Sequence, residues 1–118
     1  MIRIVTESMS DFTQEEAKAA DLIVMPLPIR FGMEEYWDDG VSLTQDDFYA
    51  RLRVAKELPK TSQVPVEHYR KCFNRLLENP EDEVLVITGS SKLSGCYQSA
   101  CIAREACHDP ARVTVLDS

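Results

Sequence analysis

Hydroxyl side chains gather in one stretch of the chain, residues 88–100, whose sequence is TGSSKLSGCYQSA. The stretch follows an apolar run that predicts a buried strand over 84–88, and it leads into a predicted helix over 93–107. A helix amino terminus offers unpaired N–H groups and partial positive charge, and serine hydroxyls add further donors. The stretch therefore predicts a site that binds an anion.

Familiar catalytic and phosphate-binding motifs do not fit this stretch. The nucleophile elbow G-x-S-x-G lacks its closing glycine, and the P-loop and G-x-G-x-x-G patterns are absent. Capping of the helix explains one serine but not three, because one helix needs one cap. Two alternatives stay open: a small acyl hydrolase or transferase with Ser94 or Cys96 as nucleophile, and a phosphate-ester or nucleotide binder. His68 and His108 both lie in or beside predicted helices, so the sequence shows no general base for a hydrolase or transferase.

The elements that position these residues alternate along the chain. Apolar runs of strand type alternate with segments of helical periodicity, which predicts an α/β fold with a mainly parallel sheet and helices on both faces. We expect strands over 2–6, 22–31 (bent or divided by its prolines), 84–88 and 112–116, and helices over 13–20, from 44, from 65 and over 93–107.

Four polar segments lie where a ligand would meet such a sheet. Ligands of open α/β sheets bind beyond the carboxyl ends of the strands. The segments TESMSD, TGSSKLSG and DS follow predicted strands, and KTSQ precedes a predicted helix. We expect all four to converge on one edge of the sheet.

Composition limits the classes of partner. The 118 residues suffice for one domain, and a net charge of −7 argues against nucleic acid and anionic membranes as partners. No apolar run is long enough to span a membrane or to act as a signal peptide, so we expect a cytoplasmic protein without stable membrane insertion. The four cysteines and two histidines form no zinc-binding pattern. We expect buried free thiols, no metal and no cofactor.

At this point the chain resembles the amino-terminal lobe of the DegV family over nearly its whole length. The family consists of fatty-acid-binding proteins that serve bacterial fatty-acid kinases. The pair formed by TSQ and LSG-x-YQSA at this spacing is the most specific part of the resemblance. The segments that carry it, in order, are VTESMSDF, VMPLPIRFG, DDFYARL, KTSQVPVEHYRKCF, SSKLSGCYQSACIA and VTVLDS.

The resemblance implies a role for the hydroxyl-rich stretch. It implies a fatty-acid carboxylate held by Thr61 or Ser62 of the first motif and Ser94 of the second, with Ser91 and the Gly95 backbone N–H beside it. Such a protein performs no chemistry itself. It presents the carboxylate to a separate ATP-dependent kinase subunit, which makes an acyl phosphate for phospholipid metabolism.

The resemblance also implies an apolar tunnel for the acyl chain, and we expect Ile29 and Phe31 to line it. Family members are more than twice as long as this chain, and their second lobe covers the tunnel. We therefore expect residues 1–118 to be an incomplete DegV-like lobe that lacks the second lobe and leaves Ile29 and Phe31 facing water.

This chain differs from the usual family pattern at four positions close to the motifs. The family usually has aspartate, threonine, glycine and threonine where this chain has Glu7, Met9, Lys92 and Cys96. The last two lie within the predicted carboxylate loop.

Overall fold

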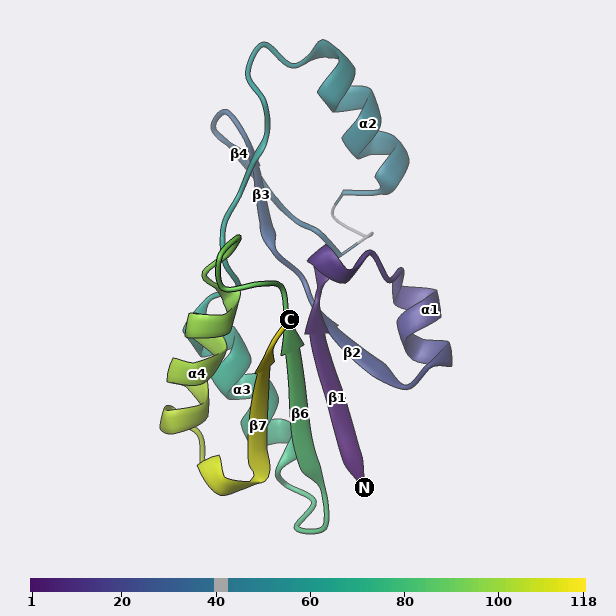
Figure 1. The fold of residues 1–118 in the computed structure, drawn as a ribbon. Helices are drawn as coiled ribbons and strands as arrows, with labels where there is room; N and C mark the ends of the chain where they lie inside the picture. Colours follow the sequence, from purple (N-terminus) through teal and green to yellow (C-terminus); the bar gives the residue numbers. More distant parts are fainter. Residues whose placement is uncertain (40–42) are drawn as a thin grey trace.

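Four parallel strands form the larger of two sheets (Figure 1). The computed structural model describes residues 1–39 and 43–118. The strands lie in the order β2-β1-β6-β7, so their carboxyl ends share one edge. Their bounds are β1 Ile2–Glu7, β2 Leu22–Met25, β6 Glu83–Thr88 and β7 Val113–Asp117.

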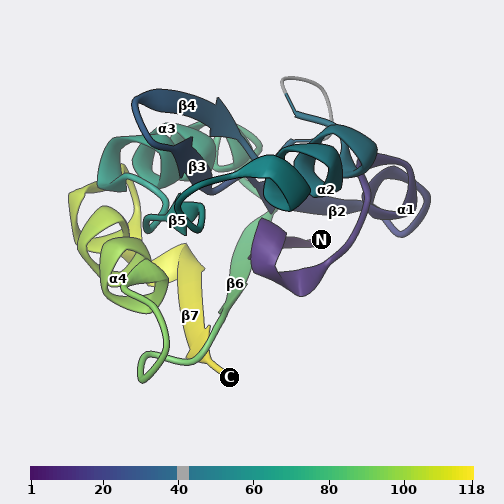
Figure 2. The same ribbon diagram turned by 90° about the horizontal axis from the view of Figure 1, so that it is seen from above.

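Helices lie on both faces of this sheet, as predicted, but Ile87 of β6 and Leu116 of β7 stay 37% and 47% exposed. The chain runs outward from β1 to β2 and, in the opposite direction, from β6 to β7. Right-handed crossovers then place the connecting helices on opposite faces. Helix α1 (Gln14–Ala19) packs against β2, whereas α3 (Val66–Leu76) and α4 (Cys96–Ala106) pack together on the other side (Figure 2).

A smaller antiparallel sheet extends beyond the carboxyl ends of the parallel strands (Figure 1). Its strands lie in the order β4-β3-β5, and α2 runs beside the β3–β4 hairpin. This part makes the molecule elongated: the radius of gyration is 15.0 Å, against roughly 13.5 Å for a compact domain of this length. The bounds are β3 Pro28–Phe31, β4 Glu34–Trp37, β5 Lys60–Thr61 and α2 Gln45–Val54.

Local signals explain most helix starts. Thr13 accepts a hydrogen bond from the Glu16 N–H, and the Glu16 carboxylate accepts one from the Thr13 N–H, which completes a capping box. Thr44 caps α2 in the same way through the Asp47 N–H. Pro65 precedes α3 at its N-cap, as predicted.

Helix α4 begins later than predicted. It starts at Cys96 rather than at 93. The reason is a tight turn, in which the Leu93 and Ser94 N–H groups both donate to the Ser90 carbonyl, at 2.9 and 3.1 Å. Residues 89–95 of the hydroxyl-rich stretch are therefore a loop, and Ser90, Ser91 and Ser94 all precede the helix.

The core lies between the parallel sheet and the α3–α4 pair. Tyr69 and Phe73 of α3 stack with ring centroids 5.7 Å apart, and both are fully buried. The α2 helix contributes no buried residue, and its Phe48 meets Phe31 edge-on. The other buried members of the core cluster include Val5, Val64, Leu76, Val84, Val86, Ala100, Ala103 and Val113.

Candidate functional site

The carboxyl ends of β1 and β6 form a topological switch point, because the chain leaves these neighbouring strands in opposite directions. Glu7, the last residue of β1, is 1% exposed. Its Oε1 accepts a hydrogen bond from the Gly89 N–H at 3.3 Å. A Cβ on Gly89 would lie 3.1 Å from the same oxygen, so glycine allows this close approach. The first residue of the hydroxyl-rich loop is thus held against the end of β1.

A second contact holds the loop to the end of β7. The Ser91 N–H donates to Asp117 Oδ1 at 2.8 Å, and the Ser91 hydroxyl lies 2.5 Å from Asp117 Oδ2. These hydrogen bonds lower the pKa of the Asp117 carboxyl below its usual range. The Ser118 hydroxyl donates to the Thr88 carbonyl at 2.6 Å. The polar segments after β1, β6 and β7 therefore converge, as the sequence predicts.

The two family motifs meet at the start of α4. The Val64 N–H, just after TSQ, donates to the Cys96 thiol, just after LSG, at 3.5 Å. Gly95 faces Gln63 so closely that a Cβ there would overlap the Gln63 amide oxygen. The fourth predicted polar segment thus joins the other three through Gln63 and Val64.

The predicted carboxylate contacts divide into two sets. Ser91, Ser94 and Gly95 line one open groove of about 510 Å³ beside the first turn of α4. Ser94 Oγ also accepts a hydrogen bond from the Cys96 N–H at 3.2 Å and so satisfies the first amide of α4, whose N-cap is Gly95. Thr61 and Ser62 are exposed and lie outside this groove. The Ser62 N–H donates to the Pro28 carbonyl at the start of β3.

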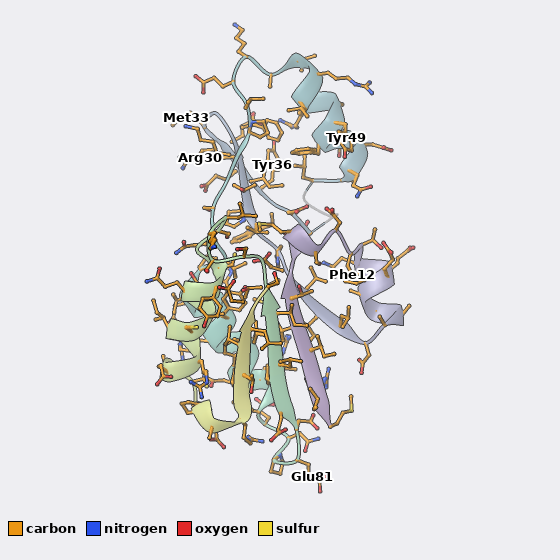
Figure 3. All side chains as sticks on the ribbon, viewed as in Figure 1. Phe12, Arg30, Met33, Tyr36, Tyr49 and Glu81 are labelled. Atoms are coloured by element: carbon orange, nitrogen blue, oxygen red, sulfur yellow. The ribbon has the colours of Figure 1, made fainter. Side chains whose placement is uncertain are left out.

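A larger and more apolar groove, of about 680 Å³, lies in the protruding part of the molecule. Phe31, Met33 and Val54 line it, with residues from the end of α2. Figure 3 shows Met33 at the tip of the β3–β4 hairpin, where it is 97% exposed. Ile29 does not line this groove. The expectation that Ile29 faces water is wrong: it is 5% exposed, because its side chain lies on the covered face of β3, opposite to that of the exposed Arg30.

Cys96 is poorly placed to be a nucleophile. Its side chain is fully buried, and burial together with the neighbouring Glu7 carboxyl raises the pKa of the thiol. The histidines lie elsewhere: His68 packs beside Trp37 with ring centroids 5.0 Å apart, and His108 follows the far end of α4. The described residues therefore give neither Ser94 nor Cys96 a histidine base.

Three residues that organise this site have no role predicted from the sequence. Glu7 stands out there only as a difference from the family pattern, and Gln63 and Asp117 only as parts of motifs. Asp117 was recognisable in principle, since an acid at the carboxyl end of a strand lies at the ligand-binding edge. The contact of Glu7 with Gly89 joins residues 82 positions apart, and no local pattern encodes it.

Residues 1–39 and 43–118 contain no group of three or more His, Cys, Asp or Glu side chains placed to hold a metal ion. None of their helices is both long and apolar enough to cross a membrane.

Comparison with known proteins identifies the family of this chain. The profile of the family described as "Uncharacterised protein, DegV family" matches residues 1–118. A DegV domain-containing protein of Caldanaerobacter subterraneus is 39% identical over 117 residues, which are 99% of this chain and 40% of that protein. A Thermotoga maritima protein named "Fatty acid-binding protein" is 34% identical, over 95% of this chain and 39% of its own length.

A solved structure agrees with these relatives. The stearic acid-binding protein of Eubacterium ventriosum superposes with a TM-score of 0.88 at 31% identity, over 99% of this chain and 41% of that one. The α/β fold with its four-stranded parallel sheet is thus the fold of these relatives. The chain belongs to the DegV family, and it spans about two fifths of the length of the relatives it matches.

Proposed function

We propose that this protein binds a long-chain fatty acid and holds its carboxylate at the amino terminus of α4. The observation that carries the proposal is the meeting of the two motifs, in which Val64 N–H donates to Cys96 Sγ and Gln63 faces Gly95. The names of the Thermotoga maritima and Eubacterium ventriosum relatives give the ligand class as fatty acid.

The chemistry of the groove suits a carboxylate. A buried anion needs hydrogen bonds, and the first-turn amides of a helix have no backbone acceptor of their own. Ser94 supplies a hydroxyl beside those amides, and Thr61 or Ser62 supplies one from the other motif. Ser91 lies beside this set, with its own hydroxyl donating to Asp117. Donors of this kind hold a carboxylate without a covering arginine, so one oxygen stays open to attack a phosphoryl group.

The acyl chain would supply most of the affinity. Each buried methylene contributes about 0.8 kcal/mol. Phe31 lies in the apolar groove between the hairpin and α2, and we propose it as a contact of the acyl chain, with Met33 and Val54.

We further propose that the protein is not an enzyme and that its partner is the catalytic subunit of a fatty-acid kinase. The resemblance to the DegV family supports this partner. The buried Cys96 thiol, with its raised pKa, gives no support to a thiol nucleophile.

The experiment is to purify the intact protein and to identify lipids in an organic extract by mass spectrometry. Titration of the delipidated protein with oleate and with palmitate then gives the affinity. A kinase subunit with ATP should convert bound oleate into its acyl phosphate only when this protein is present. Absence of a co-purifying lipid together with no binding of either acid contradicts the proposal. Stabilisation by nucleotides but not by fatty acids would favour the nucleotide-binding alternative.

A further inference from the structure

Helix α2 stands at the far end of the molecule, beside the β3–β4 hairpin (Figure 1). Its half-buried residues are Phe48, Arg51 and Leu52, which lie on one face because they are three and four positions apart, and no residue of α2 is fully buried. A helix of ten residues is only marginally stable by itself. The position of α2 therefore depends on the contacts of this one face.

Two contacts join this face to the hairpin. Phe48 meets Phe31 edge-on, with ring centroids 5.8 Å apart. Arg51 Nη1 donates to Glu34 Oε2 at 2.6 Å, and the Tyr36 hydroxyl donates to the same oxygen at 2.8 Å. The Arg51 guanidinium carbon also lies 4.8 Å from the centroid of the Tyr36 ring, a cation–π contact. Figure 3 shows Tyr36 between the hairpin and α2.

The polar contact is formed at neutral pH but is held weakly. The hydrogen bonds from Tyr36 and Arg51 lower the pKa of the Glu34 carboxyl, so the carboxylate stays ionised. The side chains of Glu34 and Arg51 nevertheless remain 61% and 42% exposed, and an exposed ion pair stabilises by only a small amount. A contact of this strength holds two elements together and still opens readily.

Arg51 belongs to this contact and also to the wall of the apolar groove. Phe31 and Met33 line the groove from the hairpin, and Arg51 and Val54 line it from α2. The groove is thus bounded by the two elements that the contact of Arg51 with Glu34 joins. Separation of α2 from the hairpin would widen the groove and free an acyl chain that lies in it.

We infer that Glu34, Tyr36 and Arg51 form a latch that holds α2 against the hairpin and so controls the rate at which an acyl chain enters and leaves the groove. This inference rests on the proposed function and adds to it a step that governs ligand exchange. The latch borders the acyl-chain groove and not the first turn of α4, so its effect does not depend on the carboxylate. Oleate and methyl oleate should therefore respond alike.

Exchange of the two charges separates the latch from other effects of substitution. Glu34→Arg and Arg51→Glu each place like charges together, whereas the double variant restores an ion pair with its polarity reversed. Arg53→Glu is the matched control: it makes the same charge change two residues further along α2, at a position that is exposed and outside the groove. Each variant is made in the intact protein.

Release of oleate and of methyl oleate is measured by stopped-flow transfer to excess phosphatidylcholine vesicles. Each single latch variant should release both ligands about threefold faster or more, the scale of one exposed ion pair. The double variant and Arg53→Glu should release them within about twofold of the wild-type rate. Wild-type rates in the single variants, an effect on oleate alone, or release from the double variant as fast as from the single variants would overturn the inference.

Amide exchange of the ligand-free protein measures the latch without any ligand. The Phe48 N–H, which donates to the Thr44 carbonyl at 2.9 Å, should exchange faster in both single variants and at the wild-type rate in the double variant. Unchanged exchange in the single variants contradicts the latch. A wild type that binds neither ligand would contradict the proposed function, while the exchange result still decides whether the latch holds α2.

Discussion

The Val64 amide donates a hydrogen bond to the Cys96 thiol, with 3.5 Å between N and Sγ, and both residues are fully buried. The two residues are 32 positions apart in the sequence. Because Val64 follows TSQ and Cys96 follows LSG, this contact joins the two segments that the DegV resemblance marks as the head-group site. A shared buried contact of this kind keeps two loops in a fixed relation without any ligand present.

Removing one hydroxyl from each segment tests the predicted carboxylate contacts. The double variant Thr61→Ala with Ser94→Ala should weaken fatty-acid binding, since each lost hydrogen bond to a charged group costs roughly 1.5–3 kcal/mol. The fold should persist, because Thr61 is exposed and Ser94 is half-buried. Isothermal titration with oleate measures the loss. The control is Thr114→Ala, an exposed hydroxyl on β7. Normal oleate binding by the double variant would mean that the head group lies in another loop.

The contact between Ser91 and Asp117 predicts a pH dependence of the loop. Hydrogen bonds from Ser91 lower the pKa of Asp117 in the folded protein. The contact is therefore fully formed above the unfolded-state pKa of aspartate, about 3.9, and it is lost as the pH falls through the lower folded value. The Ser91 amide resonance, followed by NMR from pH 6 downward, should titrate below that value. Asp117→Asn should abolish this titration, and an unchanged curve in that variant would assign it to another group.

Thiol labelling tests whether Cys96 is a nucleophile. Burial raises the pKa of the Cys72 and Cys96 thiols, and Cys107 is also buried, whereas Cys101 is half-buried beside a groove. The thiolate is the reactive form, so iodoacetamide at neutral pH should label Cys101 first. Peptide mapping by mass spectrometry identifies the labelled residue, and urea-unfolded protein is the control for reactivity. Rapid labelling of Cys96 in the folded protein would instead favour the hydrolase or transferase alternative.

Residues 1–118 expressed alone should bind fatty acid weakly and associate with one another. If half of a C16 chain, about seven methylenes, lacks cover, about 5–6 kcal/mol of burial is lost, a factor of roughly 10⁴ in affinity. Met33 and Val54, 97% and 80% exposed, should drive association. Replacing both by serine should shift sedimentation towards monomer, and Ile102→Ser on α4 should not. Sub-micromolar binding of oleate to a monomeric 1–118 chain would show that this lobe holds the whole site.

The fold could be predicted from the sequence wherever a local pattern determines it. Apolar runs such as residues 84–88 mark strands of the parallel sheet, although Ile87 stays 37% exposed, and Thr13 with Glu16 marks a helix start. The start of α4 could not be predicted, because the Ser90 carbonyl accepts two amide hydrogen bonds that a hydrophobic pattern does not encode. The split of 22–31 into strands of two different sheets follows from Pro26 only once the second sheet is known.

The general position of the candidate site could be predicted from the sequence, but its individual contacts could not. Strand order brings the polar segments to one edge, and that follows from alternating strands and helices. The Glu7 contact with Gly89 depends on which strands become neighbours, and the half-burial of Phe31 and the burial of Ile29 depend on what packs against the small sheet. Such long-range relations require the three-dimensional structure.

The central claim is that the carboxylate binds at the first turn of α4, and chemical-shift mapping tests it most directly. Oleate is added to one sample of the isotopically labelled, delipidated intact protein, and methyl oleate is added to another. The changes in backbone amide chemical shift that the two ligands cause are then compared. The difference between the two ligands should be largest at residues 91–97 and at 61–64, where the head-group site is proposed. A difference centred elsewhere, for example at residues 79–83 on the opposite edge of the sheet, would contradict the account.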